Sequence, residues 1–210
     1  MPPPDDTIRI LTVDDHPLIC TGIEALIAAH PGMEMVATAA SGAEAVRQFR
    51  AHRPDVTLMD LHLPQMSGLD AIVAIRKEFP DARIIVLTTD AGDVQVRRAL
   101  QAGAHGYVLK SALHRELIDG IRAVHAGRKC LSPEVMFEMA EHMLDDAPTP
   151  EELRVLRLVA QGLANKEIAA RICVSEATVK GHVASLLSKL GANDRTHAVV
   201  IGVKRGMIEP

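Results

Sequence analysis

Five polar residues stand where short apolar segments of the chain end. Asp14 and Asp15 follow IRILTV (8–13), and Asp60 ends DVTLMD (55–60). Thr88 lies near the end of RIIVLTT (83–89), and Lys110 ends GYVLK (106–110). If these segments are strands of one parallel sheet, their carboxyl ends meet at the same edge, where such sheets bind ligands. The spacing therefore predicts that three carboxylates, a hydroxyl and an ammonium group converge.

That set of groups suits one kind of chemistry. Close carboxylates repel one another unless a cation neutralises them, and oxygen ligands are those that Mg²⁺ prefers. The metal would balance charge while Asp60 acts as a nucleophile toward a phosphoryl group. Lys110 would hold one phosphoryl oxygen, and Thr88 would donate a hydrogen bond to another. A single strand-end aspartate is more often structural, so the prediction rests on the combination.

The elements that must position these residues form a repeating pattern. The four segments and MEMVATA (33–39) are mostly continuous in apolar character, which is typical of strands buried on both faces. Helical spacing separates them, as at Ile19–Ile27 and Leu117–Val124, and Gly32, Gly103 and Gly127 stand just past helix ends, where left-handed residues are favoured. The order predicts a doubly wound α/β fold with a five-stranded parallel sheet.

The pattern changes after Gly127. Residues 133–144 predict a short helix with Ser132 as N-cap, and the polar, proline-containing stretch 145–152 predicts a linker, with a boundary near 146–149. Residues 151–205 show only helical periodicity. Within them, a short helix at 166–172 with Asn165 as N-cap and a longer one from Ser175 to about Leu190 predict a helix-turn-helix.

The longer of these helices has two different faces. Its inner face is apolar, and its outer face is small and polar (Ala177, Thr178, Gly181, Ser185 and Ser188, flanked by Lys180 and His182). An ordinary amphipathic helix with a solvated face gives the same pattern. Residues 147–210 hold 9 Lys and Arg against 6 Asp and Glu, whereas residues 1–146 hold 14 against 21. This division favours insertion of the helix into a DNA groove.

Composition excludes several classes of protein. Aromatic residues make up 2% of the chain, with no Trp, which argues against single-stranded nucleic-acid binding by base stacking. Cys20, Cys130 and Cys173 lie far apart without a CxxC pair, so neither a zinc site nor a disulfide framework is expected, and each is predicted to be buried. The absence of a signal peptide or a long apolar segment predicts a cytoplasmic protein without membrane association.

Residues 8–126 resemble the receiver domain of bacterial two-component response regulators. The matching motifs are VDDHP (13–17), MDLHLPQMSG (59–68), LTT (87–89) and GYVLK (106–110). The resemblance implies a flavodoxin-like fold in which Asp60 is the phosphoacceptor. It also implies that Asp14, Asp15, Asp60 and the backbone carbonyl of His62 hold Mg²⁺. Further implied roles are phosphoryl binding by Lys110 and a conformational switch formed by Thr88 and Tyr107.

Residues 149–205 resemble the LuxR-type helix-turn-helix domain, through GLANKEIA (162–169) and VSEATVKGHV (174–183). This resemblance implies contacts with double-stranded DNA by Asn165, Lys166, Thr178, Lys180 and His182. It also implies a dimer contact through a fourth helix at about 195–205. Gly181 and Ala184 stand where larger side chains often read bases, so phosphate contacts and DNA shape are expected to supply much of the affinity.

Together the two resemblances match the NarL/FixJ subfamily of response regulators. They imply a receiver at 1–127, a linker with a short helix at 128–148 and a DNA-binding domain at 149–210. The implied protein is not an enzyme but a transcription regulator that a sensor histidine kinase phosphorylates and that dimerises on promoters.

Two rivals and two departures from the family pattern remain. One rival is an aspartyl phosphatase, which usually has an acid at the place of His62, and the other is a DNA-binding regulator with a vestigial receiver. Ser111 replaces a common proline that follows a cis bond, and Thr89 is bulkier than usual. We interpret the side chains of His16 and His62 as rim groups, with metal ligation by either ring as the less favoured alternative.

Overall fold

The computed structural model describes residues 7–89, 92–143 and 145–208. Two compact units divide the chain, one that runs through Phe137 and one that contains Gly92–Gln95 and the residues from Glu138 onward. Each unit has its own hydrophobic core and is described separately. No helix in the described residues is long and apolar enough to cross a membrane.

The first unit is built on a parallel sheet with the strand order β2-β1-β3-β4-β5-β6. The five predicted strands form within one residue of their expected limits: β1 (Ile8–Val13), β2 (Met33–Ala39), β3 (Val56–Asp60), β4 (Ile84–Thr88) and β5 (Gly106–Leu109). The prediction of five strands was one short, because β6 (Cys130–Leu131) pairs with β5 at the edge. Two residues are too few to give a periodic signal in the sequence.

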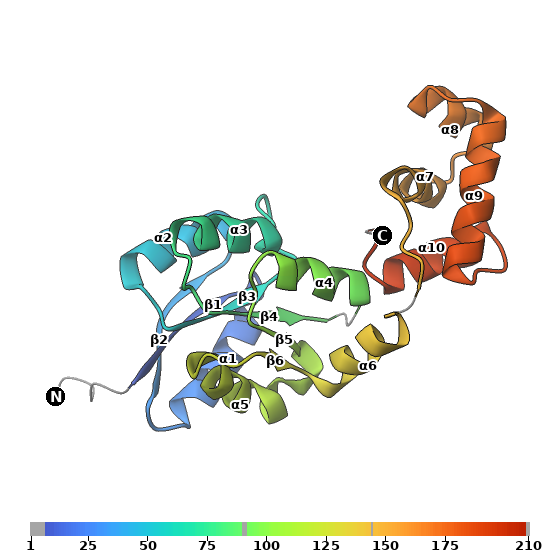
Figure 1. The fold of residues 1–210 in the computed structure, drawn as a ribbon. Coiled ribbons are helices and arrows are strands. Elements are labelled where there is room, and N and C mark those ends of the chain that lie inside the picture. The colour runs from blue at the N-terminus through green and yellow to red at the C-terminus, as the bar shows by residue number, and fades with distance from the viewer. Residues whose placement is uncertain (1–6, 90–91, 144, 209–210) are drawn as a thin grey trace. The chain divides into compact units, whose positions relative to one another are not determined.

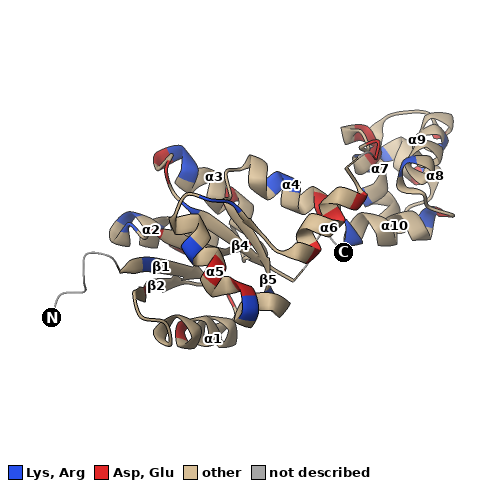
Figure 2. Cartoon of the chain, turned by 60° about the horizontal axis from the view of Figure 1, so that its bottom comes forward, with Lys and Arg blue, Asp and Glu red and all other residues tan. Residues whose placement is uncertain are grey.

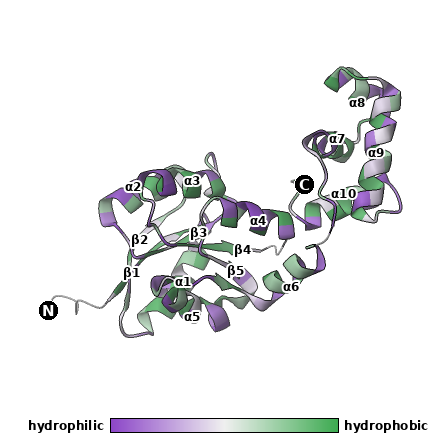
Figure 3. Cartoon of the chain, in the orientation of Figure 1, coloured by the Kyte–Doolittle hydropathy of each residue, from purple (hydrophilic) through white to green (hydrophobic). Residues whose placement is uncertain are grey.

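Helices cover both faces of this sheet, which confirms the doubly wound α/β class. Helices α1 (Pro17–Ala28) and α5 (Leu113–His125) lie on one face (Figure 1). Helices α2 (Gly42–His52), α3 (Gly68–Glu78) and α4 (Asp93–Gln101) lie on the other. Alternate strand residues such as Ile10 and Leu58 pack against α1 and α5, and their neighbours Leu11 and Met59 are equally buried. Burial on both faces explains the continuous apolar strands visible in Figure 3.

Several local predictions have definite outcomes. Gly32, Gly103 and Gly127 adopt the left-handed conformation, with φ of 81°, 104° and 78°. The peptide bonds of the described residues are all trans, including Lys110–Ser111. The prediction of buried cysteines was wrong, because Cys173 is exposed and Cys20 and Cys130 are only partly buried. Cys173 is the left-handed C-cap of a helix, a position on the surface that flanking apolar residues do not reveal.

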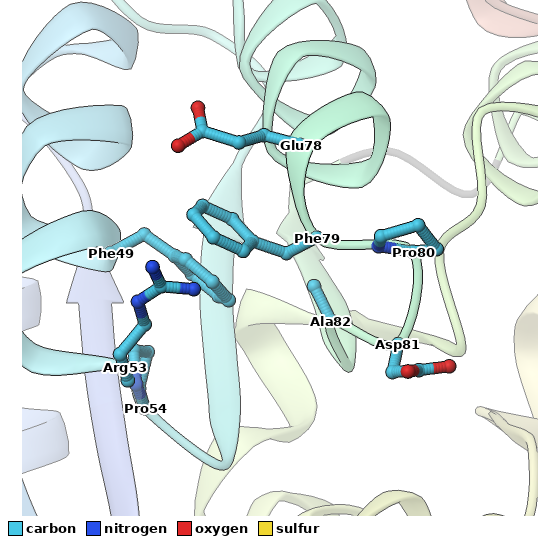
Figure 4. A pocket seen from close by; sticks show the side chains of 8 residues that line it. All are labelled: Phe49, Arg53, Pro54, Glu78, Phe79, Pro80, Asp81 and Ala82. Carbon is cyan, nitrogen blue, oxygen red and sulfur yellow. The ribbon is translucent and has the colours of Figure 1, made fainter.

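A hollow of about 350 Å³ lies between the C-terminal ends of α2 and α3 (Figure 4). The rings of Phe49 and Phe79 stack with centroids 5.0 Å apart, and the Arg53 guanidinium lies 3.9 Å from the centre of the Phe79 ring. Arg50 Nη2 also lies 2.7 Å from Glu78 Oε2. These contacts join the two helices at the end of the sheet opposite the carboxyl ends of the strands.

The second unit is helical. It contains α7 (Pro150–Ala160), α8 (Asn165–Ile172), α9 (Glu176–Leu190) and α10 (Arg195–Lys204). Helix α6 (Pro133–Glu141) precedes them and is shorter than the predicted 133–144, whose last residue lies outside the described ones. Apolar residues from α7 to α10 form one core, which includes Leu156, Ile168, Val179 and Leu186.

Of the two helix N-caps predicted in this unit, one is confirmed and one is wrong. Ser175 Oγ accepts a hydrogen bond from Thr178 N at 3.0 Å, as expected of the N-cap of α9. The N-cap of α8 is Ala164 rather than Asn165, which is the first helical residue. Glu167 Oε2 accepts a hydrogen bond from Ala164 N at 2.7 Å, and this side chain explains why the helix begins one residue early.

A buried carboxylate ties α7 to α9. Glu152 is 4% exposed, and its oxygens accept hydrogen bonds from Ser185 Oγ at 2.6 Å, Lys189 Nζ at 2.9 Å and Thr149 N at 2.7 Å. Ser185 therefore faces inward, contrary to its predicted place on the outer face of α9. Burial alone would raise the pKa of Glu152, but these hydrogen bonds outweigh it and lower the pKa to about 2.

This network gives a prediction about acid stability. A lowered carboxyl pKa stabilises the fold fully above the unfolded value of 4.5, and the contribution is lost as pH falls toward about 2. We expect Glu152→Gln to reduce the opening free energy of α7 and α9 amides by about 2 kcal/mol at pH 7. Hydrogen exchange should show this difference shrinking below pH 4.5, whereas Glu151→Gln, on the exposed side of the same turn, should change little. A difference independent of pH would contradict the assignment.

Candidate functional site

Two aspartates and a lysine meet at the carboxyl edge of the sheet. Lys110 Nζ lies 2.6 Å from Asp14 Oδ2 and donates a hydrogen bond to Asp60 Oδ2 at 2.8 Å. The side chains of Asp14 and Asp60 are 0% and 3% exposed, and that of Lys110 is 12% exposed. The last residue of β3 and the residues that directly follow β1 and β5 thus converge as the sequence predicted.

The charges of these three groups depend on one another. Burial opposes the charge on Lys110, but its hydrogen bonds and attraction to Asp14 and Asp60 outweigh burial and raise the pKa of the ammonium group. The other oxygen of Asp60, Oδ1, accepts a hydrogen bond from His62 N at 3.3 Å. The Asp60 carboxylate is therefore held at both oxygens, in a fixed orientation at the end of its strand.

The loop after Asp60 is shaped by backbone contacts. Gly68 N donates to Leu61 O at 3.0 Å, and Gln65 adopts the left-handed conformation with φ of 67°. A Cβ at residue 68 would collide with the carbonyl oxygen of Asp60, so only glycine fits where α3 passes behind the strand end. This close approach fixes the position of the His62 backbone beside the carboxylates.

The remaining strand-end residues flank this group. Asp60 is in register with Leu87, and Thr88 is in register with Leu109, the residue before Lys110. Thr88 and Tyr107 are both fully buried, so Tyr107 points into the protein rather than into solvent. Thr88 ends β4, which lies between β3, the strand that carries Asp60, and β5, the strand that leads to Lys110.

Two further side chains lie at this edge: His16, which the sequence placed at the rim of the site, and Cys20, which sequence reasoning missed. His16 Nδ1 lies 2.9 Å from Asp15 Oδ1 and 3.2 Å from Asp14 Oδ1, and Cys20 Sγ donates to Asp14 O at 3.5 Å. Burial and the nearby Asp14 raise the pKa of the Cys20 thiol. The sequence signal for Cys20 was its position in the first turn of α1, the helix that His16 caps directly after the acidic pair.

The donors at this edge fit a hard divalent cation. Ligand atoms of Asp14, Asp15, His16 and Asp60 all lie within 4.8 Å of one another. Three of the four residues offer carboxylate oxygens, the ligands that Mg²⁺ prefers. Asp15 is the most accessible of the three acids, with a side chain that is 34% exposed.

The predicted DNA-contacting residues lie on α8 and α9. Lys166, Thr178 and Lys180 are exposed, and Asn165 and His182 are partly buried. Lys180 Nζ lies 2.9 Å from Glu176 Oε1. Because this ion pair is exposed, it contributes little stabilising free energy, and Lys180 could exchange Glu176 for another partner at little cost. Figure 2 shows basic residues on α8, α9 and α10. A Cβ on Gly181 would meet nothing within 4 Å, so internal packing does not require glycine there.

Comparison with known proteins identifies the family. The response regulator receiver domain matches residues 10–122, and the LuxR family of bacterial regulatory proteins matches residues 148–201. The chain belongs to the two-component response regulators. Its receiver and LuxR-type helix-turn-helix are those of the NarL/FixJ subfamily, as the sequence motifs implied.

Individual response regulators support this assignment. The chain is 36% identical to response regulator protein VraR of Staphylococcus aureus, over 97% of this chain and 100% of VraR. A LuxR-family two-component response regulator from Aurantimonas is 42% identical, with a TM-score of 0.64, over 66% of this chain and 99% of that one. RcsB of Salmonella enterica serovar Typhimurium, solved on a promoter with the phosphomimetic BeF3−, is 25% identical, with a TM-score of 0.75 over 93% and 97%.

The ion pairs of Lys110 give a prediction about stability. Lys110→Met would leave two buried carboxylates without their counter-charge, which should reduce the free energy of unfolding by about 3 kcal/mol in the presence of a chelator. Excess Mg²⁺ should recover most of this loss. Urea unfolding followed by circular dichroism measures both, with Lys77→Met, at an exposed position of α3, as the matched control. Equal stability of the Lys110 and Lys77 variants would show that Lys110 does not offset the acids.

Proposed function

We propose that this response regulator is a transcription regulator controlled by phosphorylation of Asp60. The observation that carries the proposal is the buried Asp60 carboxylate, held between Lys110 Nζ and the amide of His62 at the carboxyl edge of the sheet. A structural aspartate at a turn has no need of a buried lysine shared with a second buried acid. A phosphoacceptor needs both, because charge accumulates on it during the reaction.

The phosphoryl group would come from a phosphohistidine of a sensor histidine kinase. An oxygen of Asp60 attacks phosphorus, the P–N bond breaks, and the departing imidazole nitrogen keeps the electron pair and takes a proton. The product is an acyl phosphate on Asp60. Lys110, already 2.8 Å from Asp60 Oδ2, would move its ion pair to the new phosphoryl oxygens.

Mg²⁺ bound by Asp14, Asp15, Asp60 and the His62 carbonyl would supply positive charge to the phosphoryl oxygens. Without a cation, the repulsion among the three carboxylates is reduced by Lys110, by the His16 ring and by backbone amides such as that of His62. Asp14 contributes from a fully buried position, whereas Asp15 remains partly open to solvent. This arrangement leaves the accessible side of the site for the phosphodonor.

Thr88 and Tyr107 would carry the signal away from the site. Thr88 would turn its hydroxyl toward a phosphoryl oxygen, and Tyr107 would occupy the space that Thr88 leaves. The two residues lie on neighbouring strands, and Val86, two residues before Thr88, is in register with Tyr107. Tyr107 is fully buried in this structure, and phosphorylation would favour the inward position of its ring.

The helical unit would bind promoter DNA as part of a homodimer. Helix α9 would lie in the major groove, with Thr178, Lys180 and His182 on its outer side and Asn165 and Lys166 reaching from α8. The absence of a packing need for Gly181 supports close approach of α9 to the duplex. The structure of RcsB bound to a promoter in the presence of the phosphomimetic BeF3− supports DNA binding by a protein of this family.

The remaining assignments follow from this role. We propose a receiver at 1–127, a linker at 128–148 and a DNA-binding domain at 149–210. The protein would act in the cytoplasm and, apart from its own phosphorylation and dephosphorylation, would not be an enzyme.

The test is a phosphorylation trial with a small phosphodonor and Mg²⁺, read by intact mass. We expect one added phosphoryl group on the wild-type chain and none on Asp60→Ala. Asp81→Ala, which removes an exposed acid from the opposite end of the sheet, should behave as wild type. An unmodified wild-type chain would refute the proposal and favour a vestigial receiver. Repeated turnover of an aryl phosphate would instead favour the phosphatase alternative.

A further inference from the structure

The ring of His16 points to the acidic site instead of capping helix α1. His16 is the N-cap of α1, with φ −98° and ψ 107°, but its side chain makes no capping hydrogen bond. Its Nδ1 instead lies 2.9 Å from Asp15 Oδ1 and 3.2 Å from Asp14 Oδ1. Pro17, which follows directly, restricts the backbone of His16 to this extended region.

His62 provides a natural comparison. Both histidines stand next to an acid of the site, and both donate their backbone amide to an aspartate oxygen, at 2.9 Å for His16 and 3.3 Å for His62. Among the described residues, only the ring of His16 joins Asp14, Asp15 and Asp60 in a group whose ligand atoms lie within 4.8 Å of one another. The side chain of His16, unlike that of His62, is therefore part of the donor set.

A small dication bound at about 2.1 Å allows its ligands to lie at most about 4.2 Å apart. The 4.8 Å bound on the group exceeds this limit by about half an ångström, and donors on adjacent sides of the ion would have to come closer than opposite ones. The His16 side chain is 68% exposed, so its ring can adjust and the open side of the site keeps room for water.

We propose that His16 Nδ1 is a metal ligand, and that this nitrogen makes the site prefer a first-row transition dication over Mg²⁺. The inference rests on the proposed function, because it concerns the cation that supports phosphorylation of Asp60. Carboxylates and water bind Mg²⁺ and Mn²⁺ alike, whereas an imidazole donor favours transition ions. His16 would therefore determine which ion the site selects without being required for the carboxylates to bind Mg²⁺.

Mn²⁺ is the probe, because its electron spin senses a directly bound nitrogen. A second group, Glu138, Glu141 and His142, offers ligand atoms within the same distance, so every protein carries His142→Ser. We expect electron spin-echo modulation from ¹⁴N in the full chain with Mn²⁺, and the ¹⁵N pattern after histidine labelling. His16→Ser should abolish it, and His62→Ser should retain it. Serine is also a favourable N-cap, so α1 is expected to persist in the His16 variant.

The affinities provide a second measurement. His16→Ser should weaken Mn²⁺ binding by about 10-fold, the scale of a perturbed metal site, and Mg²⁺ binding by much less. The inference would be overturned if the chain with His16 intact showed no nitrogen modulation, or if the modulation persisted in His16→Ser. Either result would leave His16 as a rim residue. Normal Mg²⁺-supported phosphorylation in that case would leave the proposed function intact. Failure of the wild-type chain to accept a phosphoryl group with either ion would refute the proposed function itself.

Discussion

The site depends on the burial of two carboxylates, Asp14 and Asp60, beside one another at the end of a parallel sheet. Two negative charges buried side by side cost folding free energy unless a cation compensates them. Lys110 does so by standing 2.6 Å from one acid and 2.8 Å from the other. Because one lysine serves two acids, with Asp15 close by, the site retains excess negative charge, and that excess is what a divalent cation and a phosphoryl group would relieve together.

Most of the fold was predictable because its signals are local and repeated. Five continuous apolar segments gave five strands, and glycines at helix ends gave left-handed turns at Gly32, Gly103 and Gly127. The convergence of Asp14, Asp60 and Lys110 was also predictable, since parallel strands bring their carboxyl ends to one edge. These predictions needed only the order of the elements and no knowledge of side-chain packing.

The parts that were not predictable depend on contacts between distant residues. Glu152 is an ordinary acid of a first helical turn in sequence, and only the packing of α7 on α9 buries it against Ser185 and Lys189. Strand β6 is defined by its pairing with β5 and not by its own two residues. The direction of the His16 ring follows from the conformation of one N-cap residue, which residue type alone does not determine.

Under the proposed function, phosphorylation at the carboxyl edge of the sheet controls DNA binding by the helical unit. The most direct measurement is the affinity of the full chain for promoter DNA at fixed salt, before and after phosphorylation verified by intact mass. We expect phosphorylation to tighten binding by about 10-fold or more, within the usual range of coupling between two sites, and we expect no change for Asp60→Ala. Equal affinity of the phosphorylated and unphosphorylated chains would contradict it.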